Sequence, residues 1–398
     1  MYQDLFSHDK IDFEVLRQRA SGMRWGALPE DVIPLTSADP DFKPAKEIRE
    51  EMIRYIQGGY FPYASFEGIP GLRETLANAE LVRNGVPVRP EYVIAVDSAA
   101  AALHAVATSI LKPGDEAIIF DPVDLLFGIS VRYAGATPVC YPSIYENGRW
   151  KLDDLESYIT PKTKMICLCN PHNPLGYLYG KEDLEIIAQL ADKYNLWIMN
   201  DEVWSDIVYS EKPFTSINTL GEALNRRTIT CYGFSKGFAL PGLRAGYIYV
   251  RSQEAFEKVS RICNHHSYGV DVVTQVAMKT ACGQCYYWVD AFRTHLQQMR
   301  DLMFGRLSAM PMVEPTKQEA TFVTFPNIAR TGMTSAEFAD FCLNECRVAI
   351  VPGTTTWFGP RAEGHVRFCF SSSREVLTEA MDRVENGLIR WMDKKNLG

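Results

Sequence analysis

Short apolar runs alternate with amphipathic stretches through the middle of the chain. The apolar runs are rich in valine and isoleucine, and the stretches between them repeat apolar residues at the spacing of a helix. Continuous apolar strands that are separated by helices indicate a mostly parallel, doubly wound α/β sheet that is covered on both faces. The predicted strands cover residues 92–96, 116–120, 137–141, 164–169, 196–200, 228–232 and 245–250, and predicted helices between them cover 99–111, 125–133 and 182–194.

The pattern of the chain changes after about residue 285. A long predicted helix is followed by short strands and further helices without strict alternation, an order that is typical of a smaller α+β domain. These elements cover residues 286–308, 321–325, 335–345, 366–370 and 375–394. We therefore predict a large domain over residues 41–285, a small domain over 286–398, and an N-terminal arm over 1–40 that packs on the small domain or on a partner subunit.

The composition argues against several classes of function. Of 398 residues, 46% are hydrophobic and 23% are charged, as in an ordinary soluble protein. The net charge of −8 and the lack of a basic tract argue against a nucleic-acid partner. Because no apolar run reaches the roughly 20 residues of a membrane helix, and because the N-terminus lacks the regions of a signal peptide, we expect a cytoplasmic protein without a membrane partner. The ten cysteines lack the paired spacing of a zinc site, so we expect reduced thiols and no metal.

Three polar residues, Asn173, Asp201 and Lys236, stand at or after the carboxyl ends of predicted strands, and a fourth, Arg244, follows Lys236 by eight residues. Ligands bind at that edge of a doubly wound sheet, so the four side chains can converge on one crevice. Their amide, carboxylate, amine and guanidinium are the groups that hold pyridoxal phosphate. The amine forms a Schiff base with the aldehyde, the carboxylate pairs with the pyridinium nitrogen, the amide reaches the phenolic oxygen and the guanidinium binds the phosphate. Each residue alone has an ordinary explanation, as a loop lysine, a cap, a turn residue or a surface ion pair, and it is their order that favours a cofactor site.

The motifs around these residues resemble those of the fold-type I pyridoxal-phosphate enzymes, specifically the class I and II aminotransferases. The resemblance covers nearly the whole chain and implies pyridoxal 5′-phosphate as the cofactor. In that family the helix N-terminus at Ser98, Ala99 and Ala100 offers N–H groups to the phosphate. The position of Arg367 binds the α-carboxylate of the substrate. A tyrosine at the position of Tyr63 reaches the cofactor of the neighbouring subunit, which implies a homodimer with shared active sites.

Gly233 and Ser98 depart slightly from the phosphate-binding pattern of this family, and two positions around the cofactor ring depart from it more strongly. Trp204, which with Ser235 completes the predicted cofactor-binding set, stands where tyrosine or histidine is usual, and its indole cannot exchange a proton as a phenol can. Asp124 stands where an aromatic residue normally stacks on the cofactor ring, and Phe127 is the nearest substitute. A carboxylate there is costly unless it meets a cation, so Asp124 favours a cationic substrate such as a hydroxylated arginine. Alternatively, Asp124 points to solvent or caps the following helix.

The predicted roles of the site residues follow from this resemblance. Arg367, Asn173 and Asp124 are predicted to bind an amino-acid substrate. Lys236 is predicted to remove the proton from its Cα, while Asp201 keeps the cofactor ring protonated as an electron sink. Lys236 and Asp201 are therefore the predicted catalytic residues.

The type of reaction stays open between two outcomes. The N-terminal residues 19–25, 31–34 and 38–42 resemble the cystathionine β-lyase-like branch of the family, whose members eliminate groups from Cβ. With the two departures, this resemblance favours an elimination-type lyase or cyclase. The alternative is an aminotransferase that transfers the α-amino group to a 2-oxo acid. A third hypothesis is a ligand-sensing domain that binds the cofactor without turnover, although the sequence contains no basic helix-turn-helix segment that would accompany it.

Overall fold

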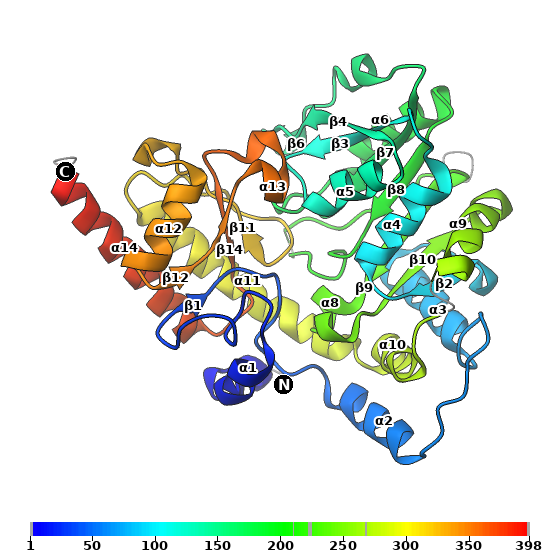
Figure 1. Cartoon of the computed structure of the whole chain (residues 1–398), viewed down its shortest axis with the longest axis horizontal. Helices are drawn as coiled ribbons and strands as arrows, with labels where there is room; N and C mark the ends of the chain where they lie inside the picture. The colour runs from blue at the N-terminus through cyan, green and yellow to red at the C-terminus, as the bar shows by residue number, and fades with distance from the viewer. Residues whose placement is uncertain (1–2, 210, 222–224, 267–268, 396–398) are drawn as a thin grey trace.

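A seven-stranded sheet forms the centre of the large domain. The computed structural model describes residues 3–209, 211–221, 225–266 and 269–395 (Figure 1). The strand order is β2-β10-β9-β8-β7-β3-β4, and β10 runs antiparallel to both of its neighbours while the other pairs are parallel. The strands are β2 (Val93–Val96), β3 (Glu116–Asp121), β4 (Thr137–Pro142), β7 (Thr163–Cys169), β8 (Trp197–Asp201), β9 (Thr228–Gly233) and β10 (Gly246–Val250). All seven predicted strands are confirmed to within one residue at each end.

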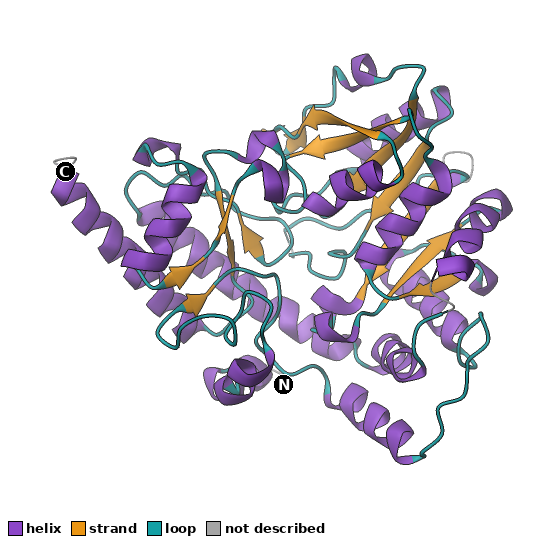
Figure 2. Ribbon diagram, in the orientation of Figure 1, coloured by secondary structure: helices purple, strands orange, loops and turns teal. Residues whose placement is uncertain are grey.

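Helices pack on both faces of this sheet, as Figure 2 shows. Alternate side chains of one strand enter different apolar clusters: in β7, Met165 and Cys167 pack with the cluster that includes α4, whereas Ile166 and Leu168 pack with the cluster that includes α6. This period of two confirms that the sheet is buried on both sides. The helices of the large domain are α2 (Lys46–Gln57), α3 (Leu72–Asn84), α4 (Ala99–Ile110), α5 (Leu125–Tyr133), α6 (Lys181–Lys193), α8 (Phe234–Gly237), α9 (Gln253–His266) and α10 (Val272–Gln284).

The small domain combines long helices with short strands. A three-stranded sheet has the order β11-β14-β13. The helices and strands of the small domain are α11 (Tyr286–Ala309), β11 (Val323–Thr324), α12 (Ser335–Glu345), β12 (Val348–Ala349), β13 (Val351–Pro352), α13 (Thr355–Phe358), β14 (Val366–Cys369) and α14 (Arg374–Lys395). The predicted strand over 321–325 is shorter than expected, because Thr321 has a φ of 70° that does not belong to an extended strand.

The N-terminal arm packs against the small domain. After helix α1 (Phe13–Arg19), strand β1 (Ile33–Pro34) pairs in parallel with β12, and the two strands lie side by side in Figure 1. This pairing agrees with the first of the two placements expected for the arm. The domain boundaries themselves stay a prediction.

Three further findings concern membrane helices, metal sites and cysteines. Among the described helices, none is long and apolar enough to cross a membrane. Within the same part of the chain, no cluster of histidine, cysteine, aspartate or glutamate has the geometry of a metal site. The ten cysteines are free thiols, nine of them buried.

Candidate active site

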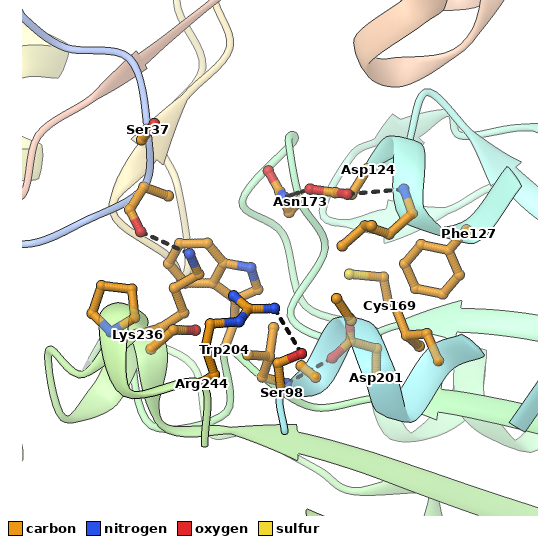
Figure 3. Close-up of a pocket in the computed structure, with 18 of the residues that line it drawn as sticks. Ser37, Ser98, Asp124, Phe127, Cys169, Asn173, Asp201, Trp204, Lys236 and Arg244 are labelled. Carbon is orange, nitrogen blue, oxygen red and sulfur yellow. Dashed lines mark hydrogen bonds between the residues drawn. The ribbon is translucent and has the colours of Figure 1, made fainter. Parts of the chain in front are cut away.

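A cavity of about 270 Å³ lies at the carboxyl ends of the central strands. The carboxyl ends of β7, β8 and β9 point toward it, and the N-terminus of α4 borders it (Figure 3). Arg367, on β14 of the small domain, also lines the cavity. All the predicted site residues of the chain line this cavity except Tyr63. They are Ser98, Ala99, Ala100, Asp124, Asn173, Asp201, Trp204, Ser235, Lys236, Arg244 and Arg367.

Lys236 lies in α8, directly after β9, with its amine inside the cavity. Nζ donates a hydrogen bond of 2.7 Å to the carbonyl oxygen of Ala38, and it lies 5.2 Å from the ring centre of Trp204. Burial lowers the pKa of the amine, and the charge of Arg367 lowers it further. A lowered pKa increases the fraction of neutral amine, which is the form that attacks an aldehyde or takes a proton.

Asp201 is the last residue of β8, and its carboxyl group is buried beneath the cavity. Oδ1 accepts a hydrogen bond of 2.9 Å from the backbone N–H of Val203. Burial raises the pKa of Asp201 to about 7, and the charges of Asp124 and Glu202 raise it in the same direction. A buried carboxyl group in this state is stabilised in its ionised form by a cation placed against it.

Arg244 and the N-terminus of α4 form the anion-binding end of the cavity. Nη2 of Arg244 donates a 2.8 Å hydrogen bond to Oγ of Ser98, which in turn accepts from the N–H of Ala101 at 3.1 Å. The first N–H groups of a helix have no partner within the helix and carry partial positive charge. This arrangement suits a phosphate.

Two glycines allow the N-terminus of α4 to approach the sheet. Gly233 and Gly246 are register partners at the ends of β9 and β10. A Cβ at Gly246 would stand 2.8 Å from the backbone carbon of Ser98, and one at Gly233 would stand 3.0 Å from Cβ of Ala99. A side chain at either position would therefore push the helix N-terminus away from the cavity.

Arg367, Asn173 and Asp124 form a hydrogen-bonded series across the cavity. Nη1 of Arg367 donates to Oδ1 of Asn173 at 3.3 Å, and Nδ2 of Asn173 donates to Oδ2 of Asp124 at 2.9 Å. The guanidinium also donates to the carbonyl oxygen of Thr36 at 3.3 Å and lies 5.0 Å from the ring centre of Phe358. Only 7% of Arg367 is exposed, and this burial lowers the pKa of its guanidinium. The group is thus oriented but lacks a full counter-charge.

Asp124 has both of the locations that the sequence left open. It is the N-cap of α5, where Oδ1 accepts from the N–H of Leu126 at 3.1 Å, and it also lines the cavity. Phe127, the expected substitute for a stacking ring, is a buried cavity residue that lies away from Lys236 in Figure 3. Trp204 is buried and packs edge-on against Phe322 at 4.7 Å between ring centres.

Tyr63 lies outside this cavity. Its side chain is fully exposed on the connection between α2 and α3, and it lines a separate surface pocket with Tyr55 and Lys279. Its predicted contact with a neighbouring subunit's cofactor stays a prediction.

The sequence did not identify the backbone groups that hold the two buried cations. Ala38 and Thr36 supply the carbonyl oxygens that accept from Lys236 and Arg367. Ala38 falls in the N-terminal motif 38–42, but a carbonyl is present on every residue and gives no signal of its own.

The chain matches known proteins over nearly its whole length. A family model described as aminotransferase class I and II matches residues 30–384. The chain therefore belongs to the class I and II aminotransferase family. An aspartate aminotransferase of Pyrococcus abyssi is 34% identical over 376 residues, which cover 93% of this chain and 93% of that protein.

Solved structures agree on the fold. An aromatic aminotransferase of Pyrococcus horikoshii superposes with a TM-score of 0.86 at 31% identity, covering 93% of this chain and 97% of that chain. Cystalysin of Treponema denticola superposes with a TM-score of 0.89 at 20% identity, covering 97% of this chain and 99% of that chain. At that identity, the likeness to cystalysin concerns the fold alone. The predicted fold-type I architecture is confirmed.

The groups around the cavity fit the cofactor that the motifs predicted. Arg244 and the N-terminus of α4 are complementary to a phosphate, the buried carboxyl group of Asp201 to a protonated ring nitrogen, and the amine of Lys236 to an aldehyde. Pyridoxal 5′-phosphate is therefore the cofactor of this chain, as its family membership implies.

Proposed function

We propose that the chain is an aminotransferase that moves the α-amino group of an amino acid to a 2-oxo acid. The observation that carries this proposal is the convergence of Lys236, Asp201, Arg244 and Arg367 on one cavity in a chain of this family. The relatives named above are aspartate and aromatic aminotransferases, which supports transamination.

Each residue has a defined task in this proposal. Arg367 binds the α-carboxylate, because its buried guanidinium is already oriented by Asn173. Arg244 and the N–H groups of Ala99 and Ala100 at the start of α4 hold the phosphate. Asn173 retains a second amide N–H, beyond the one given to Asp124, for the phenolic oxygen of the cofactor.

Proton movement depends on Lys236 and Asp201. When bound, pyridoxal phosphate supplies an aldehyde that captures the amino group and a ring that withdraws electrons from Cα. Lys236 takes the proton from Cα, and burial favours this role because it lowers the pKa of the amine. Asp201 keeps a proton on the ring nitrogen by presenting a buried carboxylate to it. Trp204 borders the amine and keeps water from one side of it.

Elimination, the reaction that the sequence favoured, has less support. The named relatives are aminotransferases, and the likeness to cystalysin stands at 20% identity. The N-terminal motif behind that expectation includes residues with a structural role, because Arg24 pairs with Asp41 in the interior and the carbonyl oxygen of Ala38 accepts from Lys236. We retain as further proposals a cytoplasmic homodimer, with Tyr63 acting across the subunit boundary, and the domain limits 41–285 and 286–398.

The test is a turnover assay on the purified holoenzyme with amino acids as donors and 2-oxo acids as acceptors. We expect a 2-oxo acid to form in step with consumption of the acceptor. Ammonia released without an acceptor, or a ring-closed product, would decide against transamination. In the same assay Lys236→Ala should lower kcat by about 10⁴-fold, the upper range for a lost general base. Lys164→Ala, at an exposed lysine outside the cavity, should retain normal turnover.

A further inference from the structure

We propose that Asp124 selects amino acids whose side chains end in a positive charge, such as a guanidinium or an ammonium. This inference rests on the proposed function, because it names the class of substrate for the same cavity. It is carried by the placement of Asp124 and by the charges that surround it.

The carboxylate of Asp124 is held in one orientation from two sides. Leu126 donates its backbone N–H to Oδ1, and the amide of Asn173 donates to Oδ2. The backbone N–H of Asp124 also donates to the carbonyl oxygen of Asn173 at 3.2 Å. A carboxylate offers about four lone-pair positions, so these contacts fix the group and leave acceptor capacity for a ligand.

The charges of the cavity leave Asp124 without an assigned partner. Five charged side chains line the cavity in the described part of the chain: Asp124, Asp201, Lys236, Arg244 and Arg367. In the proposed function Arg244 would hold the phosphate of the cofactor, Asp201 would face its ring nitrogen and Lys236 would bind its aldehyde, so these three side chains each have a partner. The two groups that donate to Asp124 are uncharged.

Binding of the substrate removes a further positive charge that compensates Asp124. Before it binds, the negative charge of Asp124 partly offsets the effect of burial on the pKa of Arg367. The α-carboxylate of an amino acid then neutralises Arg367 directly. A half-buried carboxylate that loses its compensating cation is destabilised unless another cation arrives. A positively charged side chain on the same substrate supplies that cation.

The hydrogen-bond series places both charged groups on one side chain of the cavity. Arg367 and Asp124 bind opposite ends of the amide of Asn173. A substrate whose α-carboxylate contacts Arg367 therefore has Asp124 close to its side chain. Aspartate or glutamate would instead place a second carboxylate near Asp124, and this repulsion selects against acidic side chains.

Arginine and citrulline provide the sharpest comparison, because they match in length and shape and differ in charge. In the holoenzyme we expect kcat/KM to be about 10- to 100-fold higher for arginine than for citrulline, the value of one charge-assisted contact. Asp124→Asn should remove most of this ratio, chiefly by lowering the value for arginine. Asp124→Ser, which keeps a helix-capping side chain, should do the same.

Asp271→Asn is the matched control, because Asp271 also caps a helix, α10, but lies outside the cavity lining. It should leave the ratio unchanged. A wild-type ratio near one, or a ratio that survives both substitutions at Asp124 in proteins of normal thermal stability, would overturn the proposal and leave Asp124 as a helix cap only. If neither amino acid nor any other donor is turned over, the proposed function itself fails, and the inference fails with it.

Discussion

Arg24 and Asp41 form an ion pair in which only 4% and 2% of the two side chains are exposed. Arg24 also donates to the carbonyl oxygen of Pro34 at 2.9 Å, and the indole of Trp25 donates to Asp41 at 2.8 Å. These contacts fasten both ends of the segment 34–41, which contains the carbonyl groups that accept from Lys236 and Arg367. The pair therefore supports the active site from the N-terminal arm without entering the cavity.

Removing one member of this pair should destabilise the protein strongly. Arg24→Met leaves the carboxylate of Asp41 buried and without its cation, so the free energy of unfolding should fall by about 3–5 kcal/mol. Urea denaturation measures this change. The matched control is Arg347→Met, at an arginine that pairs with Asp31 on the surface, where solvent screens the pair and the loss of stability should be much smaller. Equal losses in the two variants would contradict the buried role of Arg24.

The stability of the cofactor-free protein should depend on pH because of the buried carboxyl group of Asp201. Its pKa is about 7 in the folded chain against 3.8 for the ordinary group, so the folded state binds more protons between these values. The stabilisation is therefore complete below about pH 4 and is lost as the pH rises toward 7, by up to about 4 kcal/mol. In Asp201→Asn the stability should depend less on pH over this range, as seen by denaturation at several pH values. Parallel pH profiles for the two proteins would show that this group does not titrate there.

Arg244 should affect the affinity for the cofactor only through its contact with the phosphate group. Arg244→Ala removes a guanidinium that can form charge-assisted hydrogen bonds, so the Kd for pyridoxal phosphate should rise by about 10- to 100-fold. The Kd for pyridoxal, which has no phosphate, should stay close to the wild-type value. Fluorescence titration of the cofactor-free protein measures both. Arg251→Ala, at an arginine just beyond β10 and outside the cavity, serves as the control and should alter neither constant.

Arg367 should be needed for the substrate's carboxylate and not for its amine. Arg367→Leu should lower kcat/KM for amino acids by about 100-fold or more, because a bidentate contact to the carboxylate is lost. The rate of reaction with the corresponding decarboxylated amine should change little. Stopped-flow absorbance of the bound cofactor can follow both reactions. Arg361→Leu, at an exposed arginine of the same segment, should preserve the preference for the amino acid. A comparable loss for the amine would show that Arg367 maintains the structure of the site instead of binding the carboxylate.

The sequence predicted the large sheet better than the small domain for a physical reason. Each strand of the large sheet is a continuous apolar run, because both faces are buried, and such a run is visible without the structure. In the small domain and the arm, several strands are only two residues long and are too short to show a period. They are β1 (Ile33–Pro34), β12 (Val348–Ala349) and β13 (Val351–Pro352).

The same distinction applies to the site. Lys236 and Arg244 were predicted because their side-chain chemistry stands in recognisable local motifs. The carbonyl groups of Thr36 and Ala38 were not, because they depend on the path of the backbone far away in sequence. The sequence could not decide whether Asp124 is a helix cap or a cavity residue. The start of α5 lies at the edge of the cavity, so the same carboxylate caps the helix and lines the cavity.

Lys236 and Arg244 both belong to the single connection between β9 and β10, which is closed by the pairing of Gly233 with Gly246. The distance between the covalent attachment point and the phosphate anchor is thus set by the register of one antiparallel pair. Insertions or deletions within this connection would shift one anchor relative to the other and detach a cofactor of fixed length. Changes of substrate preference are therefore accommodated more readily outside this connection, at cavity residues such as Asp124 whose position does not depend on that register.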